Sequence, residues 1–224
     1  MSLSLTASLA SMASFGRAAD LTGRIVITRK ITKKHVTMPV YQLRGASAAV
    51  ETDTSAPINE YRSVVVFLEG ELPDTDAPVQ TELQQQNQRF DPQLLVVPVH
   101  STVSFPNADP IFHNVFSLSV AKKFDLGYYP AGQTRVVKFD EPGVVQVYCH
   151  LHPNMYAAIV VVPNRWSARP ADDGTFSLSG VPAGKYGLVA WHMSGGFFRR
   201  NIQMPAEGSV DVVMTIPVRE ESRQ

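Results

Sequence analysis

One short segment constrains the fold of this chain more than any other. The chain has a single cysteine, Cys149, which follows the apolar alternating run 144–148, and His152 and Met155 stand three and six residues after it. With six histidines and seven methionines in 224 residues, a given cysteine has this pair at these positions by chance about once in 1,200. Thiolate, imidazole and thioether groups suit copper better than hard cations. The segment therefore predicts a metal site at the end of a strand.

A second imidazole is available upstream as His113, in another alternating segment that we interpret as a strand. Alternation along 144–150 places Cys149 on the buried face of its strand and His150 on the opposite face. We therefore expect His152, and not His150, to complete the set. Two histidines, one cysteine and a weak axial methionine, here Met155, form the ligand set of a blue-copper electron-transfer site.

Residues 90–162 resemble a cupredoxin of the plastocyanin, amicyanin and azurin kind. The resemblance rests on the run 94–109 with its Phe-x-Asn-x-Asp ending, on the pair His113-Asn114 and on the short Cys-x2-His-x2-Met spacing from Cys149. It implies a Greek-key β-sandwich with one type 1 copper ion and a role for Asn114 in tying the two ligand loops together. Pro153, with its fixed φ, is expected to shape the loop between the last two ligands. His100 stands where the family usually has a turn glycine, and histidine tolerates that conformation better than most residues.

The C-terminal third resembles a carboxypeptidase regulatory-like, transthyretin-type β-sandwich, because residues 172–188 combine an Asp-Gly turn, alternating apolar positions and a Pro-x-Gly turn. Residues 23–27 and 63–70 resemble the earlier strands of that sandwich. We therefore predict an all-β chain in which the copper domain is inserted into the second, smaller sandwich. The predicted divisions are a signal peptide over 1–18, strands of the smaller sandwich over 21–80 and 164–217, the cupredoxin domain over 81–163 and a disordered tail over 218–224.

Composition excludes some partners and favours an exported protein. The 20 basic residues balance the 20 acidic ones, so overall charge gives no reason to expect nucleic acid or an anionic membrane as partner. Residues 1–18 resemble a secretory signal with small residues before the cleavage point, although no basic residue precedes Arg17, so the signal is expected to begin further upstream. No later apolar run reaches the roughly 20 residues that cross a bilayer. We expect a periplasmic or secreted protein that does not span the membrane.

Three other segments carry expectations. Residues 81–88 are expected to form a strand that leads into the copper domain, and residues 44–58 a flexible surface loop. The segment Trp191-His192-Met193 is interpreted as the aromatic end of a strand with an exposed histidine. We find no Ser-His-Asp spacing, no phosphate-binding glycine loop and no paired carboxylates, so the sequence does not indicate an enzyme.

The sequence therefore predicts an exported mononuclear blue-copper protein that carries single electrons between redox protein partners, which it does not identify. The alternative is a non-redox copper-binding or envelope interaction protein in which the β-sandwich binds a partner or carbohydrate. A multicopper or dinuclear enzyme is disfavoured because one cysteine cannot supply a two-thiolate centre.

Overall fold

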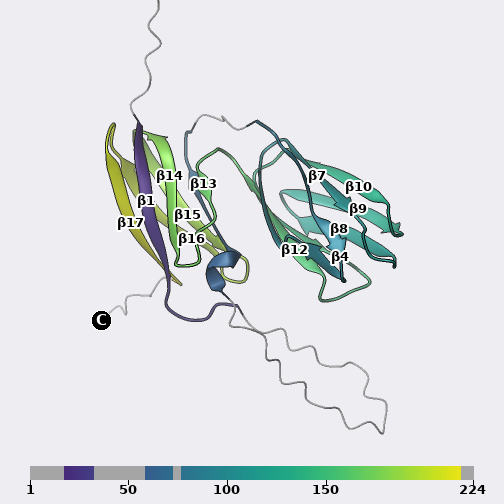
Figure 1. The fold of residues 1–224 in the computed structure, drawn as a ribbon. Coiled ribbons are helices and arrows are strands. Elements are labelled where there is room, and N and C mark those ends of the chain that lie inside the picture. The colour runs from purple at the N-terminus through teal and green to yellow at the C-terminus, as the bar shows by residue number, and fades with distance from the viewer. Residues whose placement is uncertain (1–17, 33–58, 73–76, 218–224) are drawn as a thin grey trace, which may run out of the picture.

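The computed structural model describes residues 18–32, 59–72 and 77–217, and these residues form an almost purely β structure (Figure 1). Fifteen of the described strands belong to the two sandwiches that follow. In chain order the elements are β1 Ala18–Ile27, the 3-10 helix η1 Glu60–Ser63, β2 Val64–Glu69, β3 Gln80–Glu82, β4 Gln84–Gln86, β5 Arg89–Asp91, β6 Leu94–Pro98, β7 Ser101–Pro106, β8 His113–Ser119, β9 Lys122–Tyr129, β10 Thr134–Phe139, β11 Gly143–Tyr148, β12 Tyr156–Val162, β13 Ser167–Ala168, β14 Thr175–Pro182, β15 Gly184–His192, β16 Gly196–Met204 and β17 Ser209–Ile216. The predicted all-β class is confirmed.

One sandwich, which we call the flanking sandwich, combines β1 and β2 with β13–β17. Its two sheets have the orders β14-β1-β17 and β13-β2-β15-β16. β1 alternates buried and exposed residues because only one face of its sheet is covered, and Leu21 and Ile25 from that face enter a core with Leu68, Trp166 and Leu188. β1 runs parallel to β17 and β2 runs antiparallel to β15, so the first strands of the chain pair with its last ones.

The other sandwich, the central sandwich, contains β3 and β6–β12. Its sheets have the orders β10-β7-β3 and β6-β12-β11-β8-β9, and β4 and β5 form a hairpin beside them. Phe105, Tyr129, Val147 and Ile159 lie in its core. Residues 81–88 were expected to form one strand; residues 81–82 and 84–86 lie in the short strands β3 and β4, and Asn87 and Gln88 form the turn to β5. The turn between β6 and β7 places His100 at φ 66°, the left-handed conformation implied by the turn glycine that His100 replaces in the resemblance.

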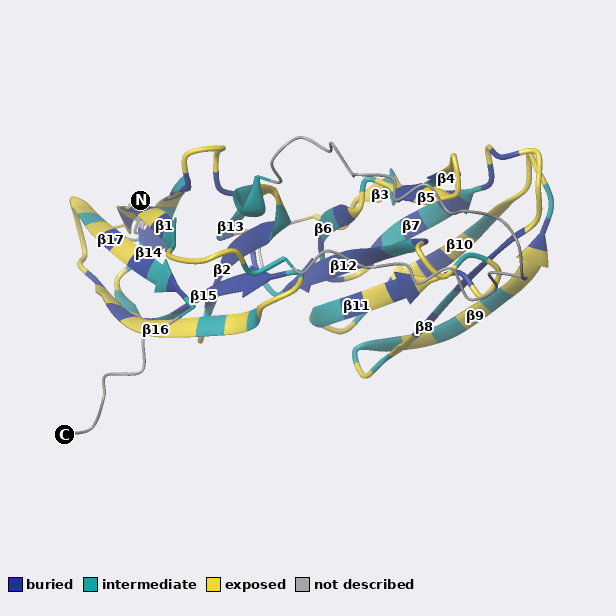
Figure 2. Ribbon diagram, turned by 90° about the horizontal axis from the view of Figure 1, so that it is seen from below, coloured by how far each residue is buried: buried dark blue, intermediate teal, exposed yellow. Residues whose placement is uncertain are grey.

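A third apolar cluster joins the two sandwiches, and Figure 2 shows the largely buried strands β2, β15 and β12 close together where the sandwiches meet. Val65, Phe67 and Trp191 project from β2 and β15, and Val160 and Val162 project from β12. This contact explains why β2 and β12 are almost continuous apolar runs, because each strand is buried on both of its faces. The central sandwich is therefore packed against its neighbour over the β6–β12 part of its larger sheet.

The chain leaves the flanking sandwich after β2 and returns to it at β13. The boundaries at 81 and 163, and the regulatory-like nature of the flanking sandwich, stay predictions. The expected signal peptide, apart from Ala18, the expected loop 44–58 and the expected tail 218–224 lie outside the described residues. Within the described ranges, no helix is long and apolar enough to cross a membrane.

The expectation of an exposed His192 is wrong. This side chain is fully buried, and its Nε2 lies 3.0 Å from Oε2 of Glu60. Its Nδ1 accepts hydrogen bonds from the backbone amides of Ser194 and Gly195, each at 3.1 Å. Buried polar groups need partners, and these contacts provide them. Desolvation lowers the pKa of His192 although Glu60 acts in the opposite direction.

Candidate metal centre

The loop that carries three of the four proposed ligands closes on itself immediately after β11. The Cys149 amide donates to the Met155 carbonyl at 3.2 Å, which extends the pairing of β11 with β12 by one step beyond Tyr148 and Tyr156. Inside this closure the Met155 amide donates to the His152 carbonyl at 2.9 Å. Pro153 thus occupies the second position of a four-residue turn, where its fixed φ is favourable. The role expected for Pro153 stays a prediction, and this geometry supports it.

Cys149 lies on the inner face of its strand line, as the alternation predicts. Val145, Val147 and Cys149 are buried, whereas Tyr148 and His150 are exposed. The thiol therefore faces the core of the central sandwich. Met155, which is 1% exposed, belongs to the same core cluster.

His113 is the first residue of β8 and is fully buried, where it pairs with Tyr129 of β9. The loop that leads into it is organised by the buried Asn107, whose side-chain amide donates to the carbonyls of Ile111 at 2.9 Å and Tyr129 at 3.1 Å. His152 approaches from the 149–155 loop and is only half-buried. Desolvation, followed by the charge of His113, lowers the pKa of His152. The neutral imidazole that a metal requires is therefore favoured.

The fold brings together three donor atoms from these two segments. The Nδ1 atoms of His113 and His152 are 3.1 Å apart, and Sγ of Cys149 lies 3.9 Å from the first and 3.7 Å from the second. Within the described part of the chain, these residues form the one group of three or more His, Cys, Asp or Glu side chains that could hold a metal ion.

These distances suit a transition metal. A triangle with sides of 3.1, 3.7 and 3.9 Å has one point in its plane that lies about 2.1 Å from every corner. Typical metal bonds are about 2.0 Å to imidazole nitrogen and about 2.3 Å to thiolate sulfur. One ion can therefore contact all three donors with little movement of the chain, and two imidazoles with one thiolate are the donor set that copper prefers.

Asp109 holds the first imidazole in place. Its Oδ2 lies 2.7 Å from Nε2 of His113, so the ring donates its Nε2 proton to the carboxylate and leaves the Nδ1 lone pair directed at the other two donors. Both groups are buried. A carboxylate in this position fixes the tautomer and the ring orientation of a ligating histidine.

The carboxylate is itself held by the turn between β4 and β5. The amides of Asn87 and Gln88 donate to its two oxygens at 2.6 and 2.8 Å. Both turn residues have positive φ, 54° and 55°, a conformation that costs a non-glycine residue roughly 1 kcal/mol. Burial raises the pKa of Asp109, but the hydrogen bonds from Gln88, His113 and Asn87 outweigh burial, so the pKa lies below its ordinary value. Asp109 is thus a charged acceptor for His113.

Asn114, expected to tie the ligand loops together, makes different contacts. Its amide nitrogen donates to Oδ1 of Asp125 at 2.7 Å and to the Gly127 carbonyl at 3.2 Å, so it binds β9. Its Oδ1 is buried and has no hydrogen-bond partner among the described residues. The structure instead connects the β4–β5 turn to the proposed ligand His113 through Asp109. Sequence reasoning missed this connection. The available signal was an acidic residue four positions before His113.

His150 is kept away from the donor cluster. Its ring stacks on Phe116 with the centroids 3.8 Å apart and the planes 5° from parallel, and its Nε2 lies 3.9 Å from Oδ2 of Asp125. The His150 side chain therefore lies on the outer surface of the five-stranded sheet, as strand alternation predicts.

Comparison with known proteins gives structural neighbours only. No protein-family model matches the chain, and no curated protein matches it. The chain is similar to the solved structure of a purple cupredoxin from Nitrosopumilus maritimus, with 28% identity over 38% of this chain and 99% of that one and a TM-score of 0.33. It is also similar to a Cu-containing nitrite reductase from Thermus scotoductus, with 26% identity over 40% of this chain and 23% of that one and a TM-score of 0.36. A reduced amicyanin variant matches with 25% identity over 41% of this chain and 87% of that one, with a TM-score of 0.34.

Proposed function

We propose that this chain is an exported mononuclear type 1 copper protein that carries single electrons between redox partners. The observation that carries the proposal is the triangle of His113 Nδ1, Cys149 Sγ and His152 Nδ1, with sides of 3.1, 3.7 and 3.9 Å. Met155, buried in the same core cluster as Cys149, is the fourth proposed ligand. When bound there, copper supplies a one-electron couple.

The chain's own residues would keep this couple fast and reversible. Cys149 and His113 are buried, so solvent is kept from two of the donors. His113 is fixed by Asp109, and the loop that bears Cys149, His152 and Met155 is closed by two backbone hydrogen bonds. A donor set held by strand ends and one tight loop rearranges little when the charge of the ion changes, and this supports rapid electron transfer.

Electrons would enter and leave at the edge of His152. This imidazole is the one nitrogen donor that is not fully buried, and the exposed side chains of Phe112 and Leu151 stand next to His113 and His152 in the chain. We infer that a redox partner contacts the protein there. The proposal assigns no catalytic residue, and export and a periplasmic or secreted location are part of it.

The test is voltammetry of the full chain loaded with one equivalent of Cu(II). The proposal requires a reversible one-electron wave that is lost in His113→Ala, with Lys138→Ala, an exposed residue of β10, as the matched control. Tight copper binding without a reversible wave would overturn the carrier function and favour the non-redox copper-binding alternative.

A further inference from the structure

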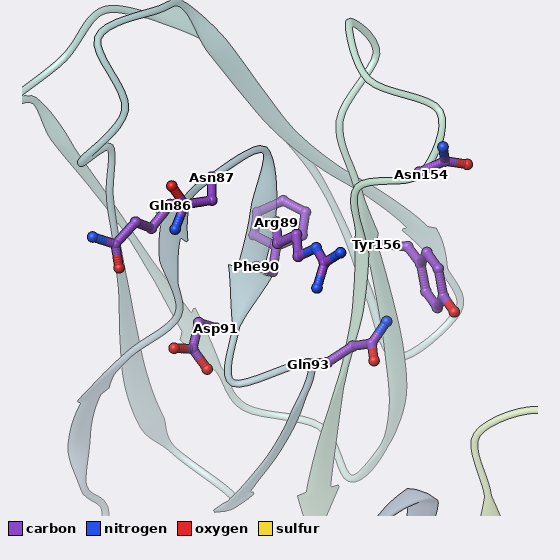
Figure 3. A pocket seen from close by; sticks show the side chains of 8 residues that line it. All are labelled: Gln86, Asn87, Arg89, Phe90, Asp91, Gln93, Asn154 and Tyr156. Carbon is purple, nitrogen blue, oxygen red and sulfur yellow. The ribbon is translucent and has the colours of Figure 1, made fainter. Parts of the chain in front are cut away.

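An open cleft of about 670 Å³ lies beside the metal centre, in the fork between β5 and the start of β12 (Figure 3). β12 pairs with β6 only from Ala158 onward, and the Ala158 amide donates to the Gln93 carbonyl at 3.0 Å, which closes the lower end of the fork. Above that point β5 pairs with β4 and leaves β12, and the cleft lies between the two strands.

The cleft presents one cation among carboxamides. Arg89 extends from β5 toward Tyr156 and Gln93 in Figure 3, and within the described ranges no carboxylate lies within ion-pairing distance of its guanidinium. The second charged residue of the lining, Asp91, is drawn on the side away from that guanidinium. The rest of the lining is Gln86, Asn87, Phe90, Gln93, Asn154 and Tyr156.

We propose that this cleft binds an acidic peptide segment, with Arg89 receiving a carboxylate of an aspartate or glutamate side chain. A guanidinium offers a planar pair of donors that matches a carboxylate, and an unpaired one in a concave site is free to form that contact. The carboxamides of Gln93 and Asn154 each offer donors and an acceptor, as a peptide backbone requires. The cleft is also much larger than a single small carboxylate needs.

The two walls of the cleft belong to the segments that position the proposed metal ligands. One wall includes Asn87, whose backbone amide holds Asp109 and through it His113. The opposite wall includes Asn154, which lies between His152 and Met155 in the ligand loop. A bound acidic segment therefore touches both segments that position the metal donors. Such a contact would dock an acidic protein beside the metal centre.

The experiment is an amide NMR titration of the metal-free full chain at constant ionic strength. Its outcome does not depend on copper or on redox activity, so it can fail while the proposed function stands. The probes are a blocked hexapeptide with a central Asp-Glu pair, the same peptide with Asn-Gln, and sodium acetate. We expect saturable shifts at Arg89, Gln93 and Asn154 with the acidic peptide, and at least roughly tenfold weaker binding of the other two probes.

Three variants isolate the guanidinium. Arg89→Gln should weaken the acidic peptide by roughly ten- to hundredfold, and Arg89→Lys should weaken it less because the charge remains. Lys123→Gln removes the same charge from an exposed position on β9 and should change the affinity less than about twofold. Equal losses in Arg89→Gln and Lys123→Gln, acetate binding as tight as the peptide, or no saturable shift at the cleft would each overturn the proposal.

Discussion

Replacing Asp109 by asparagine should weaken copper binding because it removes the charged acceptor of His113. The carboxylate accepts three hydrogen bonds, from His113 at 2.7 Å and from the amides of Asn87 and Gln88 at 2.6 and 2.8 Å. A carboxamide offers one oxygen, and its NH2 group would face at least one of these donors. We therefore expect copper affinity to fall by roughly 10- to 100-fold, the usual effect of losing such a partner of a ligating histidine.

The measurement is a competition titration of Cu(II) between the protein and a chelator of known affinity. Glu82→Gln is the matched control, because it makes the same chemical change at an exposed position of β3. We expect the control to bind copper within about twofold of the wild type. An Asp109→Asn variant whose affinity equals that of Glu82→Gln would refute the reasoning, since His113 would then need no carboxylate to hold it.

Three further outcomes are expected. Met155→Leu should retain copper and raise the reduction potential, because the axial donor tunes the couple without defining the site; an unchanged potential in voltammetry would remove Met155 from the ligand set. His150→Ala should leave the visible spectrum of the copper-loaded protein unchanged while His152→Ala abolishes it, and the reverse result would mean that the wrong imidazole is assigned. His192 has a lowered pKa in the folded chain, so the unfolded chain takes up its proton first as the pH falls below about 6.5. The unfolding free energy of the metal-free protein should therefore fall toward low pH, and His192 contributes at most about 1.4 kcal/mol per pH unit. Urea denaturation at several pH values should show that the unfolding free energy of His192→Gln depends less steeply on pH than that of the wild type. Equal pH dependence in the two proteins would contradict a lowered pKa of His192 in the folded chain.

Local patterns were enough to locate most of the candidate site. The inner position of Cys149 and the outer positions of Tyr148 and His150 follow from strand alternation, which depends only on neighbouring residues. Such features could be predicted because the physics that sets them acts within a few residues along the chain.

Features set by distant contacts could not be predicted in this way. His192 is buried against Glu60, a residue 132 positions away, and a short aromatic segment gives no sign of such a partner. The packing of β2 on β12 was also not predicted, although both runs are almost continuously apolar, which is typical of strands covered on both faces. The part played by Asp109 depends on the turn at Asn87 and Gln88, which only the folded hairpin brings to it.

The most direct test of the central claim is the visible absorption of the full chain during titration with Cu(II), with Cys149→Ser measured in parallel. We expect an intense thiolate-to-copper band that saturates at one equivalent in the wild-type protein and is absent from the variant, because Cys149 provides the one thiolate of the chain. An equally intense band in copper-loaded Cys149→Ser, or its absence from the copper-loaded wild-type protein, would contradict the assignment of a type 1 copper centre to His113, Cys149 and His152.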